Sequence, residues 1–149
     1  MTQHNDNMRQ WWLSTLACAN CELLYELLSD VELPNTARVI RAPELGTVMV
    51  QGRVGGDGAG FHFGEMTITR CSVALDDQIT GHGYIQGRDK KASHTIALLD
   101  ALLQTERQQE ILQKVIYPLV EHQKNFEKGI QEKAAATKVE FFTMARGED

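Results

Sequence analysis

The sequence predicts an α+β fold in which helices at both ends enclose a small, mainly antiparallel sheet. Three observations support this: apolar residues at helical spacing near the N-terminus, alternating apolar and polar residues in the middle, and helical spacing again from residue 89 onward. The 149 residues allow one domain with its own core. We therefore expect a single domain over residues 1–149, in which residues 121–149 form a helix and strand extension that binds a partner.

The N-terminal part should be helical. Residues 8–28 have the apolar spacing of two helices, or of one helix broken near residues 19–20. Asn20 lies where its side chain can cap the second helical segment. Pro34 then ends the helical region.

The middle of the chain has the alternation typical of strands. The expected strands are residues 37–41, 47–54, 61–75 and 79–86. Pro43 should stop the first of them. Within the third, apolar residues move from even to odd positions near Thr69 and Arg70, which predicts a bulge or bend there.

The C-terminal part returns to helical spacing. Asp89 is placed to cap a helix that runs to about Leu103, and a second helical run extends from residue 108 to about 136. Pro118 should kink or restart that second run. Residues 139–144 are of β type, so we expect two C-terminal helices followed by a terminal strand.

Charge and composition exclude several function classes. The net charge of −5 disfavours a nucleic-acid partner, because binding phosphates needs an excess of Lys and Arg. No apolar run reaches the ~20 residues that span a bilayer, and the polar start does not resemble a signal peptide, so we expect a cytoplasmic protein without a membrane partner. Three cysteines in a reducing compartment should be free thiols.

Metal and redox chemistry have weak support in the sequence. Cys18 and Cys21 have the spacing of a redox pair or of half a zinc site, but no second such pair completes four ligands. Five histidines show no ligand spacing, although His62 and His82 could meet in the sheet. We therefore predict structural thiols, no metal site, and no standard nucleotide-binding or hydrolase motif.

Two segments could bind an anion. Residues 53–60 are rich in glycine, so their backbone N–H groups could point at a ligand, or they could form an ordinary hairpin turn. The sequence GRDKK at residues 87–91 places cations at a helix start, which favours anions. If Asp89 caps that helix, however, its carboxylate already occupies the place of the anion.

Several ordered motifs resemble a known family, the PhnG subunits of bacterial carbon–phosphorus lyase. The similarity extends from about Trp11 to the C-terminus. The motifs that carry it are VIRAPELG at residues 39–46, RVGG at 53–56, GEMTITR at 64–70, GRDK at 87–90 and FFTMARG at 141–147.

The resemblance implies a subunit of the carbon–phosphorus lyase core complex in phosphonate catabolism. Members of this family contribute to displacing adenine from ATP by methylphosphonate, which gives ribose 1-methylphosphonate 5-triphosphate. The implied partners are the I, H, J and L subunits and a second copy of the chain. MgATP would be a substrate of the complex, and the chain alone would bind no cofactor and show no activity. The chain lacks the cysteine cluster that the later radical cleavage needs.

The resemblance and the residue patterns together suggest two groups of site residues, and no residue is assigned a catalytic role. The first group would bind phosphate or form salt bridges with a partner: Arg53, Gly55, Gly56, Arg70, Arg88, Asp89 and Lys90. The second would lie in a subunit interface: Phe126, Ile130, Phe141, Phe142, Met144 and Arg146. A scaffold without catalytic residues and a free-standing phosphate- or nucleotide-binding enzyme remain the alternatives.

Overall fold

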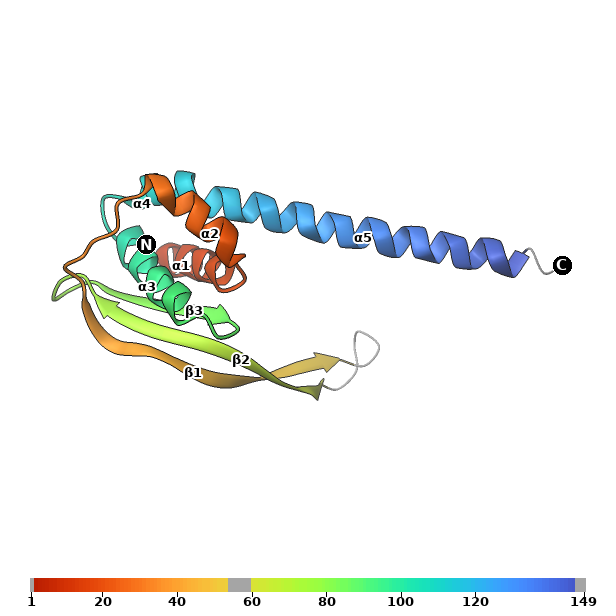
Figure 1. Ribbon diagram of the computed structural model, residues 1–149, viewed down its shortest axis with the longest axis horizontal. Coiled ribbons are helices and arrows are strands. Elements are labelled where there is room, and N and C mark those ends of the chain that lie inside the picture. Colours follow the sequence, from red (N-terminus) through yellow and green to blue (C-terminus); the bar gives the residue numbers. More distant parts are fainter. Residues whose placement is uncertain (1, 54–59, 147–149) are drawn as a thin grey trace.

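A computed structural model describes residues 2–53 and 60–146 and confirms the α+β class. A layer of helices covers one face of a three-stranded sheet, and one long helix extends away from this body (Figure 1). In chain order the elements are α1 (Thr2–Ala17), α2 (Cys21–Leu27), η1 (Leu28–Asp30), β1 (Arg38–Arg53), β2 (Gly60–Ala74), β3 (Thr80–Gln86), α3 (Lys90–Leu103), α4 (Gln108–Ile111), η2 (Leu112–Ile116) and α5 (Tyr117–Arg146).

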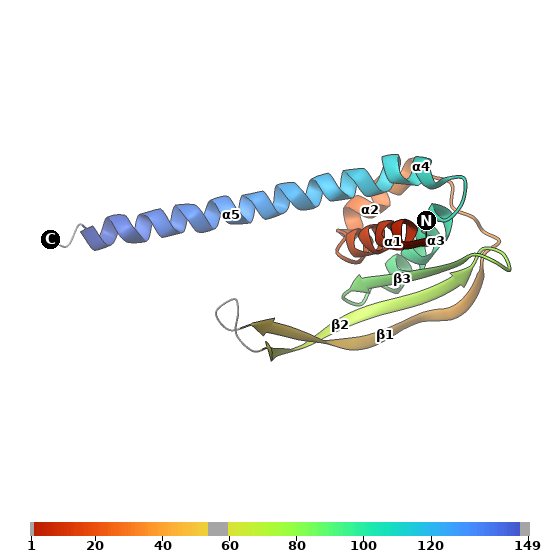
Figure 2. The ribbon, with the colours of Figure 1, turned by 180° about the vertical axis from the view of Figure 1, so that it is seen from behind.

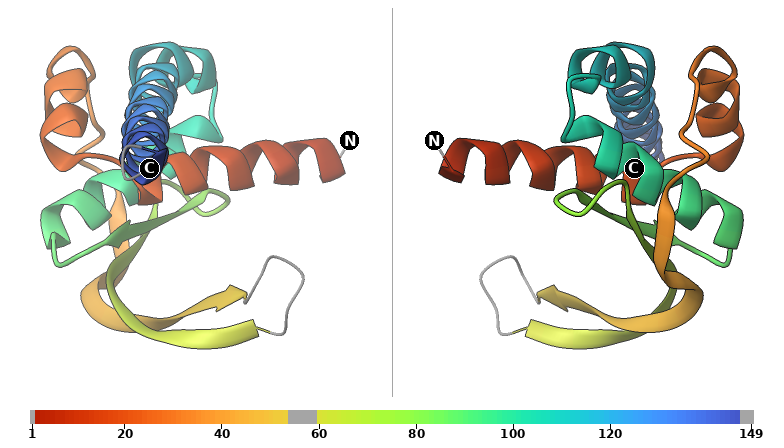
Figure 3. Two further views of the ribbon diagram at one scale, coloured as in Figure 1. Left: turned by 90° about the vertical axis from the view of Figure 1, so that its right-hand side faces the viewer. Right: turned by 90° about the vertical axis from the view of Figure 1, so that its left-hand side faces the viewer.

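The sheet is antiparallel in the order β1-β2-β3, and its strands differ greatly in length. β3 ends where Gln86 pairs with Ile68, whereas the β1–β2 ladder continues as far as Arg53 and Gly60. The β1–β2 hairpin therefore extends past β3, on the same side of the body as α5 (Figures 1 and 2). Figure 3 shows how strongly this hairpin curves.

One prediction about the strands is wrong, and one alternative of a second is not observed. Pro43 does not stop a strand: β1 is one strand of 16 residues, and the ladder absorbs the proline through a register shift between Arg41 and Glu44. The predicted irregularity at Thr69 and Arg70 is not a bulge of β2: β2 pairs with β3 without a shift from Ile68 to Ala74, and the extra residue opposite Arg70 and Ser72 belongs to β1. The apolar residues at even positions of β2 simply lie on the sheet face opposite α3.

The α3 helix packs directly on the sheet. It is apolar around most of its surface and supplies much of the core, together with Trp12, Leu16 and Leu24 from the N-terminal helices. Gly81 and Gly83 of β3 permit this close packing: a Cβ added at Gly83 would lie 2.7 Å from the backbone nitrogen of Ala97 and collide with the Ser93 carbonyl. The glycines thus set the distance between β3 and α3.

Both predicted helix caps are confirmed. The Asn20 side chain accepts a hydrogen bond of 3.1 Å from the Leu23 backbone nitrogen at the start of α2. The Asp89 carboxylate accepts one of 2.9 Å from the Ala92 nitrogen at the start of α3. The break between α1 and α2 therefore follows from local side-chain chemistry.

Of the two outcomes predicted for Pro118, the structure has the restart: a new helix begins beside the proline. Residues Leu112–Ile116 form a π-helical turn, in which the Tyr117 nitrogen donates to the Leu112 carbonyl. Proline has no N–H and its ring crowds the carbonyl four residues earlier, so the wider turn just before it relieves the clash. α5 then begins at Tyr117 and contains Pro118 in its first turn.

The predicted terminal strand is not confirmed. Residues 139–144 continue α5, which runs to Arg146. A helix satisfies its backbone groups within its own segment, whereas a strand here would need a second strand beside it. Within the described ranges, no helix is both long and apolar enough to cross a membrane.

Candidate functional site

An apolar groove lies where α5 leaves the body. The first turns of α5 pack on α1: the Trp11 and Tyr117 ring centroids lie 6.0 Å apart, and Gln123 Nε2 donates to the Thr15 carbonyl at 2.9 Å. Beyond this contact the helix extends into solvent (Figure 1). The groove has a volume of about 470 Å³ and is lined by Cys18, Ala19, Asn20, His122, Gln123, Phe126, Glu127 and Ile130.

Two predicted interface residues line this groove. Phe126 is 64% exposed and Ile130 is 53% exposed. Large apolar side chains that share a groove and remain in water indicate a contact surface rather than part of the core. Phe141, Phe142, Met144 and Arg146 lie on the last turns of α5, where the structure gives the helical backbone but not the side-chain surroundings, so their role stays a prediction.

Arg70 lies on the outer face of the sheet, away from α3. Its Nε donates to Glu44 Oε1 at 2.9 Å, and Arg41 approaches the same oxygen at 3.4 Å. All three side chains are about half exposed, so salt and water weaken these ion pairs. One carboxylate therefore serves two guanidinium groups, which leaves a net positive charge on this face.

The start of α3 is already occupied by Asp89. Besides capping the helix, its carboxylate accepts hydrogen bonds of 3.3 Å from the Tyr25 hydroxyl. Burial chiefly, and then the Asp89 charge, raises the pKa of Tyr25 to about 12. The Lys91 ammonium lies 5.0 Å from the centre of the Tyr25 ring. Of the two possibilities at GRDKK, the structure has the capped helix start.

Arg88 and Lys90 flank this cap and remain free. Both are exposed, and neither has an ion-pair partner among residues 2–53 and 60–146. Gly87 has a φ of 98°, a conformation that favours glycine, and its carbonyl accepts a hydrogen bond of 2.7 Å from Thr69 Oγ1. The loop that carries the two cations is therefore held to β2.

Two of the predicted cations, Arg53 and Arg70, lie far apart along the β1–β2 hairpin. Arg53 ends β1 opposite Gly60, which is ten residues from Arg70 along β2, or about 33 Å of extended strand. Gly55 and Gly56 lie outside the described residues, as does the anion-binding arrangement proposed for residues 54–59. Within one chain, Arg53 and Arg70 therefore lie at separate places on the hairpin.

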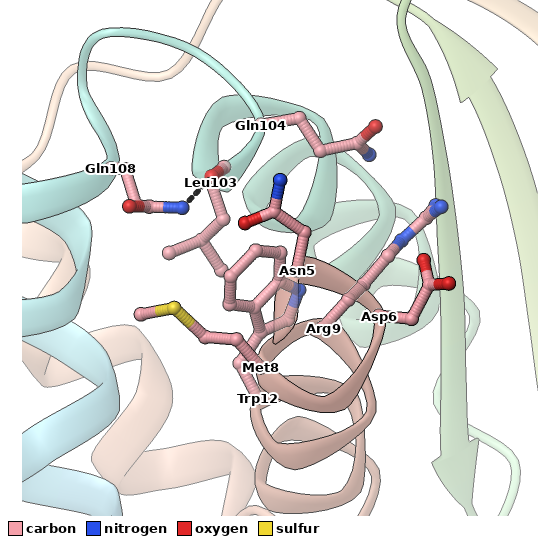
Figure 4. Close-up of a pocket in the computed structure, with 8 residues that line it drawn as sticks. All are labelled: Asn5, Asp6, Met8, Arg9, Trp12, Leu103, Gln104 and Gln108. Carbon is pink, nitrogen blue, oxygen red and sulfur yellow. Dashed lines mark hydrogen bonds between the residues drawn. The ribbon is translucent and has the colours of Figure 1, made fainter. Parts of the chain in front are cut away.

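The structure also contains a buried polar cluster that the sequence reasoning missed. Asp100 is fully buried within α3 and accepts hydrogen bonds from Arg9, from Trp12 Nε1 at 2.8 Å and from the His82 backbone nitrogen at 2.8 Å. The Arg9 side chain also lines a polar pocket of about 290 Å³ with Trp12 (Figure 4). A carboxylate in an otherwise apolar helical stripe was the signal that could have revealed this cluster.

The surroundings of His82 and of the three cysteines are those of structural residues rather than of a redox or metal site. His82 Nδ1 lies 2.9 Å from Ser72 Oγ across two strands, and the predicted His62–His82 contact lies outside the described side chains. Cys18, Cys21 and Cys71 are free thiols. Burial, and then Asp89, raises the pKa of the Cys21 thiol, which opposes the thiolate form that redox work needs. In the described part of the chain, no three acidic, His or Cys side chains gather as a metal site.

Comparisons with known proteins agree with the resemblance found in the sequence. The family model described as "Phosphonate metabolism protein PhnG" matches residues 7–147. A curated relative from Rhizobium meliloti (strain 1021) is 35% identical over 149 residues, which cover all of this chain and 92% of the relative. That relative is named alpha-D-ribose 1-methylphosphonate 5-triphosphate synthase subunit PhnG.

Proposed function

Because the chain belongs to the PhnG family of phosphonate metabolism proteins, we propose that it is a subunit of the carbon–phosphorus lyase core complex. Within that complex it contributes to a transferase reaction in which methylphosphonate displaces adenine from ATP. The product is ribose 1-methylphosphonate 5-triphosphate, and MgATP is the substrate. The chain works with the I, H, J and L subunits and a second copy of itself, and it is inactive alone.

The exposed apolar groove on α5 is the main structural observation that supports this proposal. Phe126 and Ile130 lie at helical spacing on one side of α5 and are more than half exposed, beside the connection between α1 and α2. An isolated chain gains nothing from holding these side chains in water, whereas a partner helix or strand could bury them. The groove therefore supports a protein that acts inside an assembly.

The exposed cations could bind the phosphate groups of the substrate. Arg88 and Lys90 are exposed beside the start of α3, and Arg70 shares the single carboxylate of Glu44 with Arg41. Guanidinium groups bind phosphate oxygens through paired hydrogen bonds. In the complex, these residues and Arg53 would complete a phosphate site together with partner subunits.

A scaffold without catalytic residues is the second candidate. Two observations favour it: Arg53 and Arg70 lie far apart along the hairpin, and Asp89 already caps the helix whose start would otherwise attract an anion. In that case Arg53, Arg70, Arg88 and Lys90 form salt bridges with partner subunits.

Adenine release from MgATP and methylphosphonate by the reconstituted complex tests both candidates. Omitting this chain should abolish the release. The variants Arg70→Ala and Arg88→Ala, assembled in full complexes, should lower kcat/KM for MgATP at least tenfold, whereas Asp77→Ala should have no effect. Unchanged turnover in complexes of both arginine variants would support the scaffold. Full adenine release without this chain would contradict both candidates.

A further inference from the structure

The two edges of the sheet differ in whether side chains of the same molecule bond to their backbone groups. At the β3 edge, the His82 nitrogen donates to Asp100 at 2.8 Å, and the Thr80 carbonyl accepts hydrogen bonds from Arg9 and Gln104. Side chains of the same molecule therefore cover the first part of this edge, at Thr80 and His82. At the β1 edge, no described segment other than β2 bonds to the strand backbone. An open edge can pair with another chain.

The two halves of β1 also differ. Residues 38–43 contain two register shifts and Pro43, which are features that prevent a strand from pairing further. Residues 44–50 pair regularly with β2, from Glu44 opposite Arg70 to Val50 opposite Gly64, and the next register shift follows directly. The second half is thus a regular, unprotected edge of seven residues.

This regular half carries exposed apolar side chains. Leu45, Val48 and Met49 are 48%, 37% and 60% exposed, and residues 45–50 contain no charge and no proline. A segment with high β propensity and no charge at an open edge promotes aggregation unless another strand covers it. The edge therefore requires an occupant.

The charges next to this edge indicate the kind of occupant. Arg38 and Arg41 are exposed, and Glu44 is the one carboxylate within reach of Arg41 and Arg70. A second copy that paired antiparallel around Thr47 would bring residue 41 of one copy opposite residue 53 of the other, and both are arginine. Like charges placed opposite each other destabilise strand pairing. An acidic segment of a different protein suits the edge better.

We propose that residues 44–50 of β1 bind, by strand addition, an extended segment of a partner subunit that alternates apolar residues and carries carboxylates next to Arg41. The added strand would satisfy the free backbone groups of the edge and cover Leu45, Val48 and Met49. The carboxylates would pair with Arg41, which Glu44 neutralises only in part. This inference rests on the proposed function, because it takes the partner from the same complex.

Amide hydrogen exchange on the complex purified through this chain tests the pairing. In an antiparallel ladder every second amide of an edge strand points outward, so alternate amides of residues 44–50 should exchange at least tenfold more slowly in the complex than in the free chain. Equal exchange at these amides in an intact complex would overturn the inference while leaving the proposed function in place. Failure to capture any partner would overturn both.

Matched variants identify the occupant. Leu45→Lys with Met49→Lys should reduce the captured partner at least tenfold, whereas Ile40→Lys, an exposed position in the irregular half of β1, should change it less than twofold. Arg41→Glu should reduce capture while Arg41→Lys retains it. If the edge amides are protected in a concentration-dependent dimer of this chain alone, the occupant is a second copy and the inference is wrong.

Discussion

The helices α3 and α5 show two different uses of an apolar stripe. In α3, which has 14 residues, eleven are buried, and the helix forms the centre of the core. In α5, which has 30 residues, the first turns are anchored by the buried Leu119, but Phe126 and Ile130 further along stay in solvent. The difference shows that α3 stabilises the fold of this chain, and it fits our proposal that α5 beyond Gln123 contacts another chain.

If α3 is the centre of the core, replacing its buried carboxylate, Asp100, should lower the free energy of unfolding more than any other change considered below. Asp100→Ala leaves Arg9, Trp12 Nε1 and the His82 nitrogen without their acceptor, so the free energy of unfolding should fall by about 3–5 kcal/mol. Urea unfolding of the chain measures this.

Asp77→Ala is the control for that variant. Asp77 is exposed, and its replacement should change the free energy of unfolding by less than about 0.5 kcal/mol. Equal stability of the Asp100 and Asp77 variants would show that the polar cluster does not hold α1 and β3 to α3.

The close packing of β3 against α3 should give the next largest effect. Gly83→Ala places a methyl group against the backbone of α3 at Ser93 and Ala97, which should cost about 1–3 kcal/mol of stability. Gly46→Ala is the matched change on β1, where the nearest heavy atom to the new methyl group is 4.0 Å away, so its cost should stay below about 0.5 kcal/mol. Similar thermal melting of both variants would contradict the packing argument.

Ionisation of Tyr25 should give a smaller, pH-dependent effect at the start of α3. The pKa of Tyr25 is raised to about 12, while the phenol of an unfolded chain ionises near ~10. The stability gained by keeping Tyr25 neutral is therefore complete below about pH 10 and is lost as the pH rises towards 12.

Tyr25→Phe isolates this contribution. Because phenylalanine cannot ionise, the variant should lose less stability than the wild type over that interval, as followed by urea unfolding at several pH values. Parallel losses in both proteins would contradict the raised pKa.

The elements that local chemistry determines could be predicted from the sequence. Asn20 and Asp89 cap their helices through contacts with residues three positions away, and both caps were predicted correctly. The fold class followed from apolar spacing. The bulge alternative in β2 is not observed, because the change from even to odd apolar positions reflects which face of the strand α3 covers, and the sequence does not show that face.

The elements that depend on distant contacts could not be predicted. Asp100 meets Arg9 and His82 only after α1 and β3 fold against α3, so its place in an apolar stripe could show that it is buried but not which residues bind it. The same holds for Glu44, which joins Arg41 and Arg70 across two strands. Of the predicted interface, Phe126 and Ile130 lie together in the groove, because their spacing of four residues places them on one side of a helix.

The central claim is that the exposed stripe of α5 belongs to a subunit interface. Its most direct test is co-expression of the tagged chain with the H, I and J subunits, comparing the wild type with the double variant Phe126→Ser and Ile130→Ser. A matched double variant, Lys124→Ser and Lys128→Ser, controls for the helix propensity of serine on the same part of α5.

The account predicts a stoichiometric complex for the wild type and for the lysine variant, and at least tenfold less captured partner for the Phe126 and Ile130 variant. All three chains alone should unfold within about 0.5 kcal/mol of one another, because the substituted side chains are exposed. If the wild type is recovered from the co-expression without any partner, the account is contradicted. Equal capture of partners by both double variants would also contradict it.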